Sequence, residues 1–196
     1  MLKCLKPFAH ALLKPLAVLL KDVNPNYITA FGLVFPILFF ICLINKLYVW
    51  AAVIFIFNAV DMLDGMVARA QKKETPFGAF LDSTIDRFSD FTIIVAFAFA
   101  GLAQWVVVIP LLLLTYLISY VRSRTELAAK ATLTADVGLI ERTERLVLIL
   151  FALIVYILLP SLVVSGFNII EIIFLGISIL SIITLIQRIQ FAYRKL

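Results

Sequence analysis

Long apolar runs separated by short polar segments dominate the chain. About 20 apolar residues are needed to cross roughly 30 Å of hydrocarbon. Six runs reach that length, and they cover residues 27–45, 48–68, 78–102, 104–128, 145–164 and 168–190. The polar stretch from Asp22 to Asn26 predicts a turn and a helix start, and Asn45-Lys46 predicts a tight turn between the first two runs. The pattern therefore predicts an all-α integral membrane protein with six transmembrane helices.

Residues 1–21 follow a different pattern, with leucines at helical spacing on one face and basic residues on the other. Such a segment is typical of an amphipathic helix that lies in the membrane interface. Pro7 and Pro15 would interrupt this helix. No soluble domain fits in the remainder. We therefore expect one membrane domain over residues 1–196, made of the interfacial segment 1–21 and a six-helix bundle over 27–190.

Composition and charge agree with this architecture. The chain is 64% hydrophobic and only 15% charged, which excludes an ordinary soluble domain. If both termini lie on one side of the membrane, 16 of the 17 Lys and Arg residues share that side, and only Lys46 lies on the other. The positive-inside rule then places both termini at the cytoplasmic face of the cell membrane. We expect membrane lipids as partners and no nucleic acid.

Four aspartates mark the cytoplasmic ends of the second and third runs. Asp61 and Asp64 are three residues apart and Asp82 and Asp86 four apart, so each pair shares one helix face. Carboxylates near hydrocarbon are costly, and the two neighbouring arginines cannot neutralise four of them. Oxygen ligands suit Mg²⁺ or Mn²⁺ rather than zinc. Two such ions could clamp a diphosphate, which predicts an enzyme acting on lipid with its active site on the cytoplasmic face.

These residues resemble the signature of the CDP-alcohol phosphotransferase family. The pattern is D-x-x-D-G-x-x-A-R, eight residues, then G-x-x-x-D-x-x-x-D, and its fixed positions here are Asp61, Asp64, Gly65, Ala68, Arg69, Gly78, Asp82 and Asp86. The resemblance implies six transmembrane helices and a homodimer. It also implies transfer of a phosphatidyl-type group from CDP-diacylglycerol or CDP-archaeol to an alcohol, with release of CMP.

The resemblance also implies residue roles. Asp61, Asp64, Asp82 and Asp86 would bind two divalent ions, and Asp86 would be the catalytic base as well. The CDP-lipid site would comprise Thr29, Asp61, Asp64, Gly65, Ala68, Arg69 and Gly78. For Gly65 and Ala68 the residues alone leave two functions open. Small side chains let a nucleotide approach the helix, and they equally let two helices pack closely.

Arginines at the cytoplasmic ends of later runs indicate the acceptor. They lie in segments 119–124, 138–145 and 187–188, and guanidinium groups bind phosphate in a bidentate fork. A phosphorylated acceptor is therefore expected. The segments are similar to those of the inositol-phosphate-using branch, the phosphatidylinositol phosphate and archaetidylinositol phosphate synthases. By that resemblance the acceptor phosphate would be held by Ser119, Arg122, Arg124, Arg145 and Arg188. The loop from Lys130 to Asp136 has no clear family pattern.

Three alternatives remain at this point. Glycerol 3-phosphate also carries a phosphate, so a phosphatidylglycerol phosphate synthase is the nearest one. A divalent-cation transporter could place carboxylates near a membrane face, but no inverted repeat is evident. The third alternative is a catalytically silent scaffold, although nothing in the acidic motif is degraded.

Overall fold

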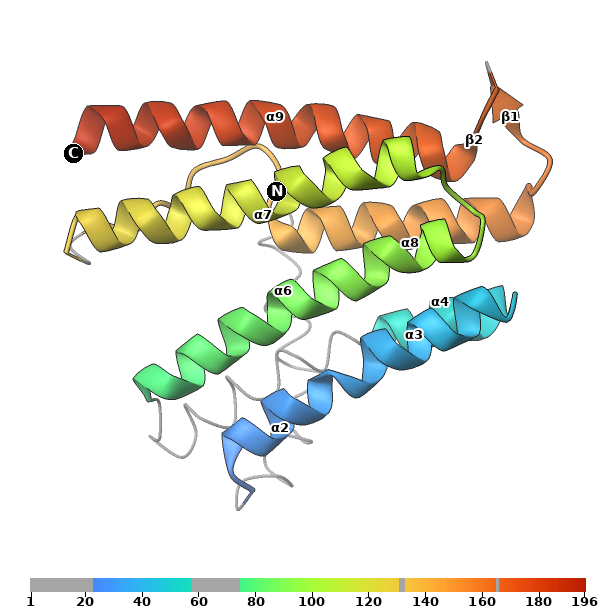
Figure 1. The fold of residues 1–196 in the computed structure, drawn as a ribbon, viewed down its shortest axis with the longest axis horizontal. Coiled ribbons are helices and arrows are strands. Elements are labelled where there is room, and N and C mark those ends of the chain that lie inside the picture. Colours follow the sequence, from blue (N-terminus) through green and yellow to red (C-terminus); the bar gives the residue numbers. More distant parts are fainter. Residues whose placement is uncertain (1–22, 58–74, 131–132, 165) are drawn as a thin grey trace. The chain divides into compact units, whose positions relative to one another are not determined.

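A computed structural model describes residues 23–57, 75–130, 133–164 and 166–196, and these are mostly helical (Figure 1). The chain divides between Ala96 and Phe97 into two compact units. Within the described residues, three helical stretches are long and apolar enough to cross a membrane, namely Asn26–Ile44, Trp105–Ala128 and Ile169–Lys195. The interfacial helix predicted for residues 1–21 lies outside the described residues. The count of six spans and the single domain stay predictions.

The first apolar run forms two helices, α2 (Pro25–Gly32) and α3 (Val34–Ile44). Asn24 caps α2, because its side chain accepts a hydrogen bond of 3.0 Å from the backbone N–H of Asn26. The helix start predicted at Asp22–Asn26 is thus confirmed at Pro25. Leu33 separates the two helices. Pro36 has no N–H to donate to the carbonyl of Gly32, which accounts for the break.

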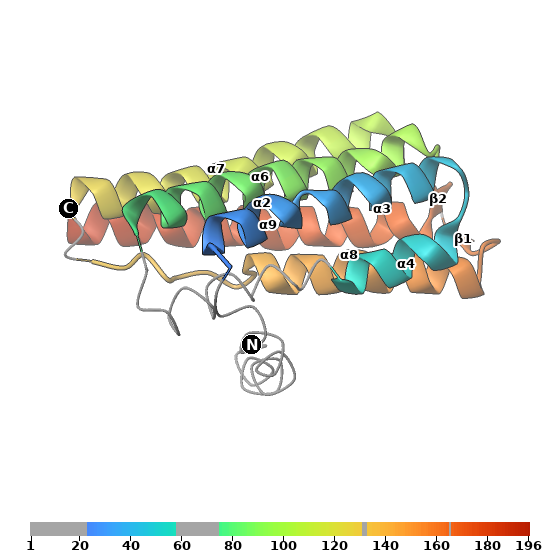
Figure 2. The ribbon, with the colours of Figure 1, turned by 90° about the horizontal axis from the view of Figure 1, so that it is seen from below.

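Helix α4 (Tyr48–Phe57) packs on α3 as a helical hairpin (Figure 2). The connection is tight, as predicted, because Leu47 N donates to Cys42 O at 2.9 Å and Lys46 adopts a positive φ of 60°. Phe39 and Phe55 meet edge to face between the helices, with ring centroids 5.4 Å apart. The rest of the second predicted run, beyond α4, lies outside the described residues.

Helix α6 (Pro76–Phe99) carries the second half of the acidic motif. Its start is set by Thr75, whose hydroxyl oxygen accepts a hydrogen bond of 3.0 Å from Gly78 N. Pro76 is favourable in the first turn, where its missing N–H costs nothing. The helix therefore begins two residues before the predicted run at 78 and ends at Phe99, short of the predicted residue 102.

The second unit contains α7 (Trp105–Ala128), α8 (Arg142–Leu158) and α9 (Ile169–Lys195). Both α7 and α8 pack along α9, which is the longest of the three (Figure 1). Large side chains fill the space between them, including Phe174, whose ring meets Phe97 edge to face at 5.1 Å. Helix α8 ends at Leu158, before the predicted residue 164, because Pro160 follows.

A small hairpin, which the all-α prediction did not include, joins α8 to α9 in this mostly helical structure. Strand β1 (Val163–Val164) pairs antiparallel with β2 (Phe167–Asn168), and Gly166 in the turn has a φ of 83°. The positive φ explains why glycine stands there. With only two residues in each strand, this hairpin is too short for alternating polarity to reveal it in the sequence.

Glu171 fastens the start of α9 to the loop before α7. Its carboxylate accepts hydrogen bonds from Asn168 N at 3.0 Å and from Gln104 N at 2.9 Å. The Asn168 side chain in turn accepts from Glu171 N and donates to Leu102 O at 2.8 Å. Glu171 is buried, and these bonds give each of its two carboxylate oxygens a hydrogen-bond donor. This end of the second unit is therefore held by a closed polar cluster.

Candidate functional site

Two of the four predicted metal ligands lie on α6. Asp82 and Asp86 are one helical turn apart and share a face of that helix. The Asp86 side chain is 16% exposed, its Oδ1 atom is buried, and its Oδ2 atom lies 3.7 Å from Nη1 of Arg87. The other predicted residues of the motif lie outside the described residues, namely Asp61, Asp64, Gly65, Ala68 and Arg69.

The two described aspartates fit a hard divalent cation. Carboxylate oxygens are the donors that Mg²⁺ and Mn²⁺ prefer. A largely buried carboxylate such as Asp86 is stabilised by nearby positive charge, and Nη1 of Arg87 lies 3.7 Å from it. Within the described ranges no three His, Cys, Asp or Glu side chains gather in one place. The described structure thus contains half of the predicted donor set, with the right chemistry.

Asp90 was missed by the sequence interpretation, which ended the acidic series at Asp86. It lies one further turn along α6 and is only 5% exposed. The signal that could have found it was the same four-residue spacing that relates Asp82 to Asp86. A third carboxylate therefore continues the face that bears the two predicted ligands.

Thr29 and Gly78, both predicted for the CDP-lipid site, belong to the first unit. Thr29 is buried on α2. A Cβ atom added at Gly78 would lie 3.2 Å from Oγ1 of Thr75 and 3.3 Å from Oδ1 of Asn26. Gly78 therefore lets the start of α6 lie close to the start of α2. The absence of a side chain at Gly78 thus has a structural role in addition to its predicted role in the CDP-lipid site.

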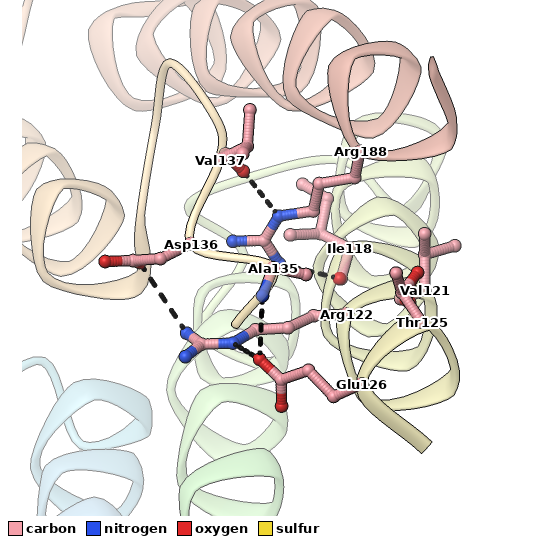
Figure 3. Close-up of polar contacts among 9 residues, drawn as sticks. All are labelled: Ile118, Val121, Arg122, Thr125, Glu126, Ala135, Asp136, Val137 and Arg188. Carbon is pink, nitrogen blue, oxygen red and sulfur yellow. Dashed lines mark hydrogen bonds and ion pairs between the residues drawn. The ribbon is translucent and has the colours of Figure 1, made fainter. Parts of the chain in front are cut away.

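Arg188 anchors three parts of the second unit to one another (Figure 3). Its Nε atom donates to Val137 O and its Nη1 atom to Ile118 O, each at 2.8 Å. The residue is buried, so these bonds join α9 to α7 and to the segment before α8 at a point shielded from solvent. The fork of the guanidinium makes both bonds possible at once.

The predicted acceptor arginines come together around Arg188. The positive charges of Arg122 and Arg145 act on its guanidinium, and the carboxylates of Glu141 and Asp136 partly offset them. Arg145 is buried like Arg188, whereas Arg122 is half-buried. A cluster of three guanidinium groups in a partly dry site favours an anion such as phosphate. Ser119 is half-buried on α7, and Arg124 is exposed.

Glu126, which the sequence interpretation also missed, holds Arg122 in this cluster (Figure 3). Its Oε1 atom accepts from Nε of Arg122 at 3.0 Å and from Ala135 N at 3.1 Å. Nη1 of Arg122 also lies 4.0 Å from Asp136. One carboxylate thus fixes both the arginine and the segment 133–137. The four-residue spacing of Arg122 and Glu126 on a helix was the available signal.

The turn before α8 rests on Thr184 of α9. The Thr184 hydroxyl oxygen accepts from Leu139 N at 3.2 Å and from Ile140 N at 3.1 Å. Gly138 has a φ of 151°, and a Cβ atom added there would lie 2.5 Å from Cγ2 of Thr184. Only glycine fits this contact without displacement. The turn sets the start of α8, and with it the position of Arg145.

Known proteins resemble this chain over most of its length. The family model described as CDP-alcohol phosphatidyltransferase matches residues 22–186. The archaetidylinositol phosphate synthase of Pyrococcus horikoshii is 38% identical over 175 residues, covering 89% of this chain and 86% of that protein. The phosphatidylinositol phosphate synthase of Mycobacteroides abscessus is 34% identical over 161 residues, covering 76% of this chain and 67% of that one.

Solved structures show the same fold. The phosphatidylinositol phosphate synthase of Mycobacterium tuberculosis with CDP-DAG bound superposes with a TM-score of 0.77 at 26% identity, covering 91% of this chain and 92% of that one. The same enzyme in complex with manganese and citrate gives a TM-score of 0.73 at 28% identity, with 95% and 88% covered.

Proposed function

We infer that this chain, which belongs to the CDP-alcohol phosphatidyltransferase family, transfers a phosphatidyl-type group from a CDP-lipid to inositol phosphate and releases CMP. One observation carries the choice of acceptor. Relatives from an archaeon and a bacterium are both named as inositol phosphate lipid synthases, and they match this chain at 38% and 34% identity. The arginine cluster around Arg188 supports the same choice, because it would bind the acceptor phosphate. Family membership favours this enzyme over a cation transporter.

Transfer begins with the acceptor hydroxyl. The carboxylate of Asp86 takes its proton, the freed oxygen attacks the lipid-bearing phosphorus, and CMP leaves with the electrons of the broken phosphoanhydride bond. Two Mg²⁺ or Mn²⁺ ions would neutralise charge on the diphosphate. The residues proposed to hold them are Asp61, Asp64, Asp82 and Asp86. A neighbour in complex with manganese supports divalent-metal chemistry in the family.

The donor is CDP-diacylglycerol or CDP-archaeol. The residues proposed for its nucleotide and phosphates are Thr29, Asp61, Asp64, Gly65, Ala68, Arg69 and Gly78. A related enzyme with CDP-DAG bound supports this class of donor. The lipid tails would stay in the bilayer while the cytidine diphosphate occupies the polar site.

The acceptor phosphate would be bound by guanidinium groups of the second unit. Arg145 and Arg188 are buried, so their charges are less screened by water and attract an anion more strongly. Arg122 would complete the site, with Ser119 and Arg124 beside it. A neutral or zwitterionic acceptor would not require this charge.

The proposed enzyme crosses the membrane six times as one domain, with residues 1–21 in the interface. Both termini and the active site face the cytoplasm, where the Lys and Arg residues gather. Two copies form a homodimer, as the family resemblance implies. The three long apolar helices within the described residues support a membrane protein.

The test is CMP release from a CDP-lipid by the purified protein with Mg²⁺, comparing inositol phosphate with glycerol 3-phosphate. Release with inositol phosphate alone is expected. Preference for glycerol 3-phosphate would keep the reaction and overturn the acceptor. A well-folded sample that releases no CMP with either acceptor would overturn the proposed reaction.

A further inference from the structure

A cavity of about 510 Å³ lies between the C-terminal turns of α9 and the backbone of residues 137–139. The α9 side chains that line it recur at helical spacing on one face, namely Gln187, Gln190, Phe191, Arg194 and Lys195. Among the described residues no carboxylate lines it, and the two cations make it electropositive. The function proposed above assigns no ligand to this cavity.

Gln187 indicates that the cavity takes a ligand with a hydrogen-bond donor. Its Oε1 atom is buried and has no hydrogen-bond partner among the described residues. A buried acceptor without a donor is unfavourable. Rotation of the Gln187 side chain toward the cavity would let a ligand hydroxyl group donate to this oxygen, while Arg194 and Lys195 would bind a phosphate on the same molecule.

Helix length and charge indicate that the cavity lies at the depth of lipid headgroups. Helix α9 has 27 residues, so it is about 40 Å long, which exceeds the roughly 30 Å of the hydrocarbon core. Its uncharged stretch runs between Glu171 and Arg188. The turns from Gln187 to Lys195 therefore extend beyond the hydrocarbon, where phospholipid phosphates lie.

We propose that this cavity, between residues 137–139 and the end of α9, binds the phosphate and hydroxyl groups of a phosphorylated polyol. Its depth indicates that the ligand is the headgroup of an anionic phospholipid such as phosphatidylglycerol. A free polyol phosphate has the same chemistry and is separated from the lipid by experiment. Basic residues in the last turn also stabilise a helix end, but that role explains neither the cavity nor the buried oxygen of Gln187.

The test is native mass spectrometry of the full chain in non-ionic detergent, titrated with phosphatidylglycerol or phosphatidylcholine. Phosphatidylglycerol is expected to bind at lower concentration. Arg194→Gln and Lys195→Gln should each weaken its binding about fivefold. Gln187→Met should also weaken it about fivefold by removing the hydrogen bond, although it changes no charge. Gln190→Met is a second charge-neutral variant, should Gln187→Met fold poorly.

Lys130→Gln is the matched control, since it removes the same charge from an exposed residue outside the cavity. It should leave phosphatidylglycerol binding unchanged. The proposal would be overturned if Lys130→Gln and Arg194→Gln weakened phosphatidylglycerol binding equally and neither charge-neutral variant weakened it. Binding would then reflect only the general attraction of a basic protein for an anionic lipid. If soluble glycerol 3-phosphate displaces the lipid from the unaltered chain, the free polyol phosphate is a ligand. If glycerol 3-phosphate does not displace the lipid, the ligand is the lipid headgroup.

Discussion

Arg188 lies among the proposed acceptor residues and also bonds two backbone carbonyls, so its substitution has two effects. Lysine at this position keeps the charge but lacks the fork that reaches both Val137 O and Ile118 O. We expect Arg188→Lys to lower the free energy of unfolding by about 1–3 kcal/mol. We also expect it to raise KM for inositol phosphate more than KM for the CDP-lipid. Thermal unfolding in detergent and steady-state kinetics measure the two effects.

The control for the effect of Arg188→Lys on stability is Arg124→Lys, because Arg124 is exposed. A change at an exposed position should alter the free energy of unfolding by less than about 0.5 kcal/mol. If Arg188→Lys instead raised KM for both substrates equally, its role in acceptor binding would be wrong and only the structural role would stand.

Asp86 is the proposed base, and Asp86→Asn tests it with almost no change in shape. The amide cannot take a proton from the acceptor hydroxyl, so transfer should fall by at least about a hundredfold. Circular dichroism should show unchanged helicity. Near-normal turnover in a CMP-release assay would remove Asp86 as the base.

At the residue scale, the sequence predicted which residues share a helix face, but not which hydrogen bonds join residues far apart along the chain. The four-residue spacing of Asp82 and Asp86 is enough to put both carboxylates on one helix face. The partners of Arg188 are backbone carbonyls of residues 118 and 137, far from it along the chain. Every residue has such a carbonyl, so nothing in the sequence marks these two.

At the scale of elements, Glu126 connects α7 to the segment before α8. Glu126→Ala removes the bonds to Arg122 and to Ala135 N, whereas Glu126→Gln keeps an oxygen for Ala135 N and loses only the charge. Since a hydrogen bond to a charged group contributes about 1.5–3 kcal/mol, we expect KM for inositol phosphate to rise about tenfold in the alanine variant. KM for inositol phosphate should rise less in the glutamine variant.

The kinetic pattern distinguishes positioning from general damage in Glu126 variants. KM for the CDP-lipid should stay unchanged, and partial recovery in Glu126→Gln should follow from the retained bond. A fall in kcat with unchanged KM for inositol phosphate would contradict a role in positioning Arg122.

Glu171 makes a separate prediction at the other end of α9. In Glu171→Gln a single amide oxygen replaces the carboxylate that accepts from Gln104 N and Asn168 N, so one buried donor loses its partner. The free energy of unfolding should fall by about 1–3 kcal/mol. KM for both substrates should not change, because Arg188 is remote along the helix. An unaltered melting temperature would show that the cluster contributes nothing.

Helix starts were easier to predict than helix breaks. The polar stretch before Pro25 contains the residue that caps α2. The apolar run that follows shows on which side of this cap the helix lies. The break at Leu33 depends on Pro36, which lies within an otherwise uniform apolar run. Hydrophobicity alone does not distinguish one span from two stacked helices, so the run was predicted as continuous.

At the scale of the molecule, many large apolar side chains are exposed, such as Val106 on α7, which is 69% exposed. A water-soluble protein would bury such surface, whereas a bilayer provides an apolar solvent for it. The membrane class was therefore predictable from composition. The grouping of Arg122, Arg145 and Arg188 was predicted from the family resemblance, but their individual contacts were not, because these depend on how α7, α8 and α9 pack.

Metal binding should stabilise the whole protein. Saturating Mg²⁺ or Mn²⁺, at about 100 times the dissociation constant, should raise the melting temperature by roughly 5–10 °C over a sample with EDTA. Asp82→Asn should abolish most of this rise, because it removes a proposed ligand. Glu171→Gln, which removes an acidic group elsewhere, should keep it. An equal rise in Asp82→Asn would argue against a metal site on α6.

The contact between Gly138 and Thr184 has a consequence for the family as a whole. A Cβ atom at position 138 would collide with the methyl group of Thr184 and not with its hydroxyl group. The two positions should therefore covary among relatives. Where evolution has replaced this glycine, we expect serine at the partner position, since serine keeps the oxygen that binds Leu139 N and Ile140 N and lacks the methyl group. Serine at position 184 is compatible with Gly138, whereas a side chain at position 138 also requires a change of the φ of 151°.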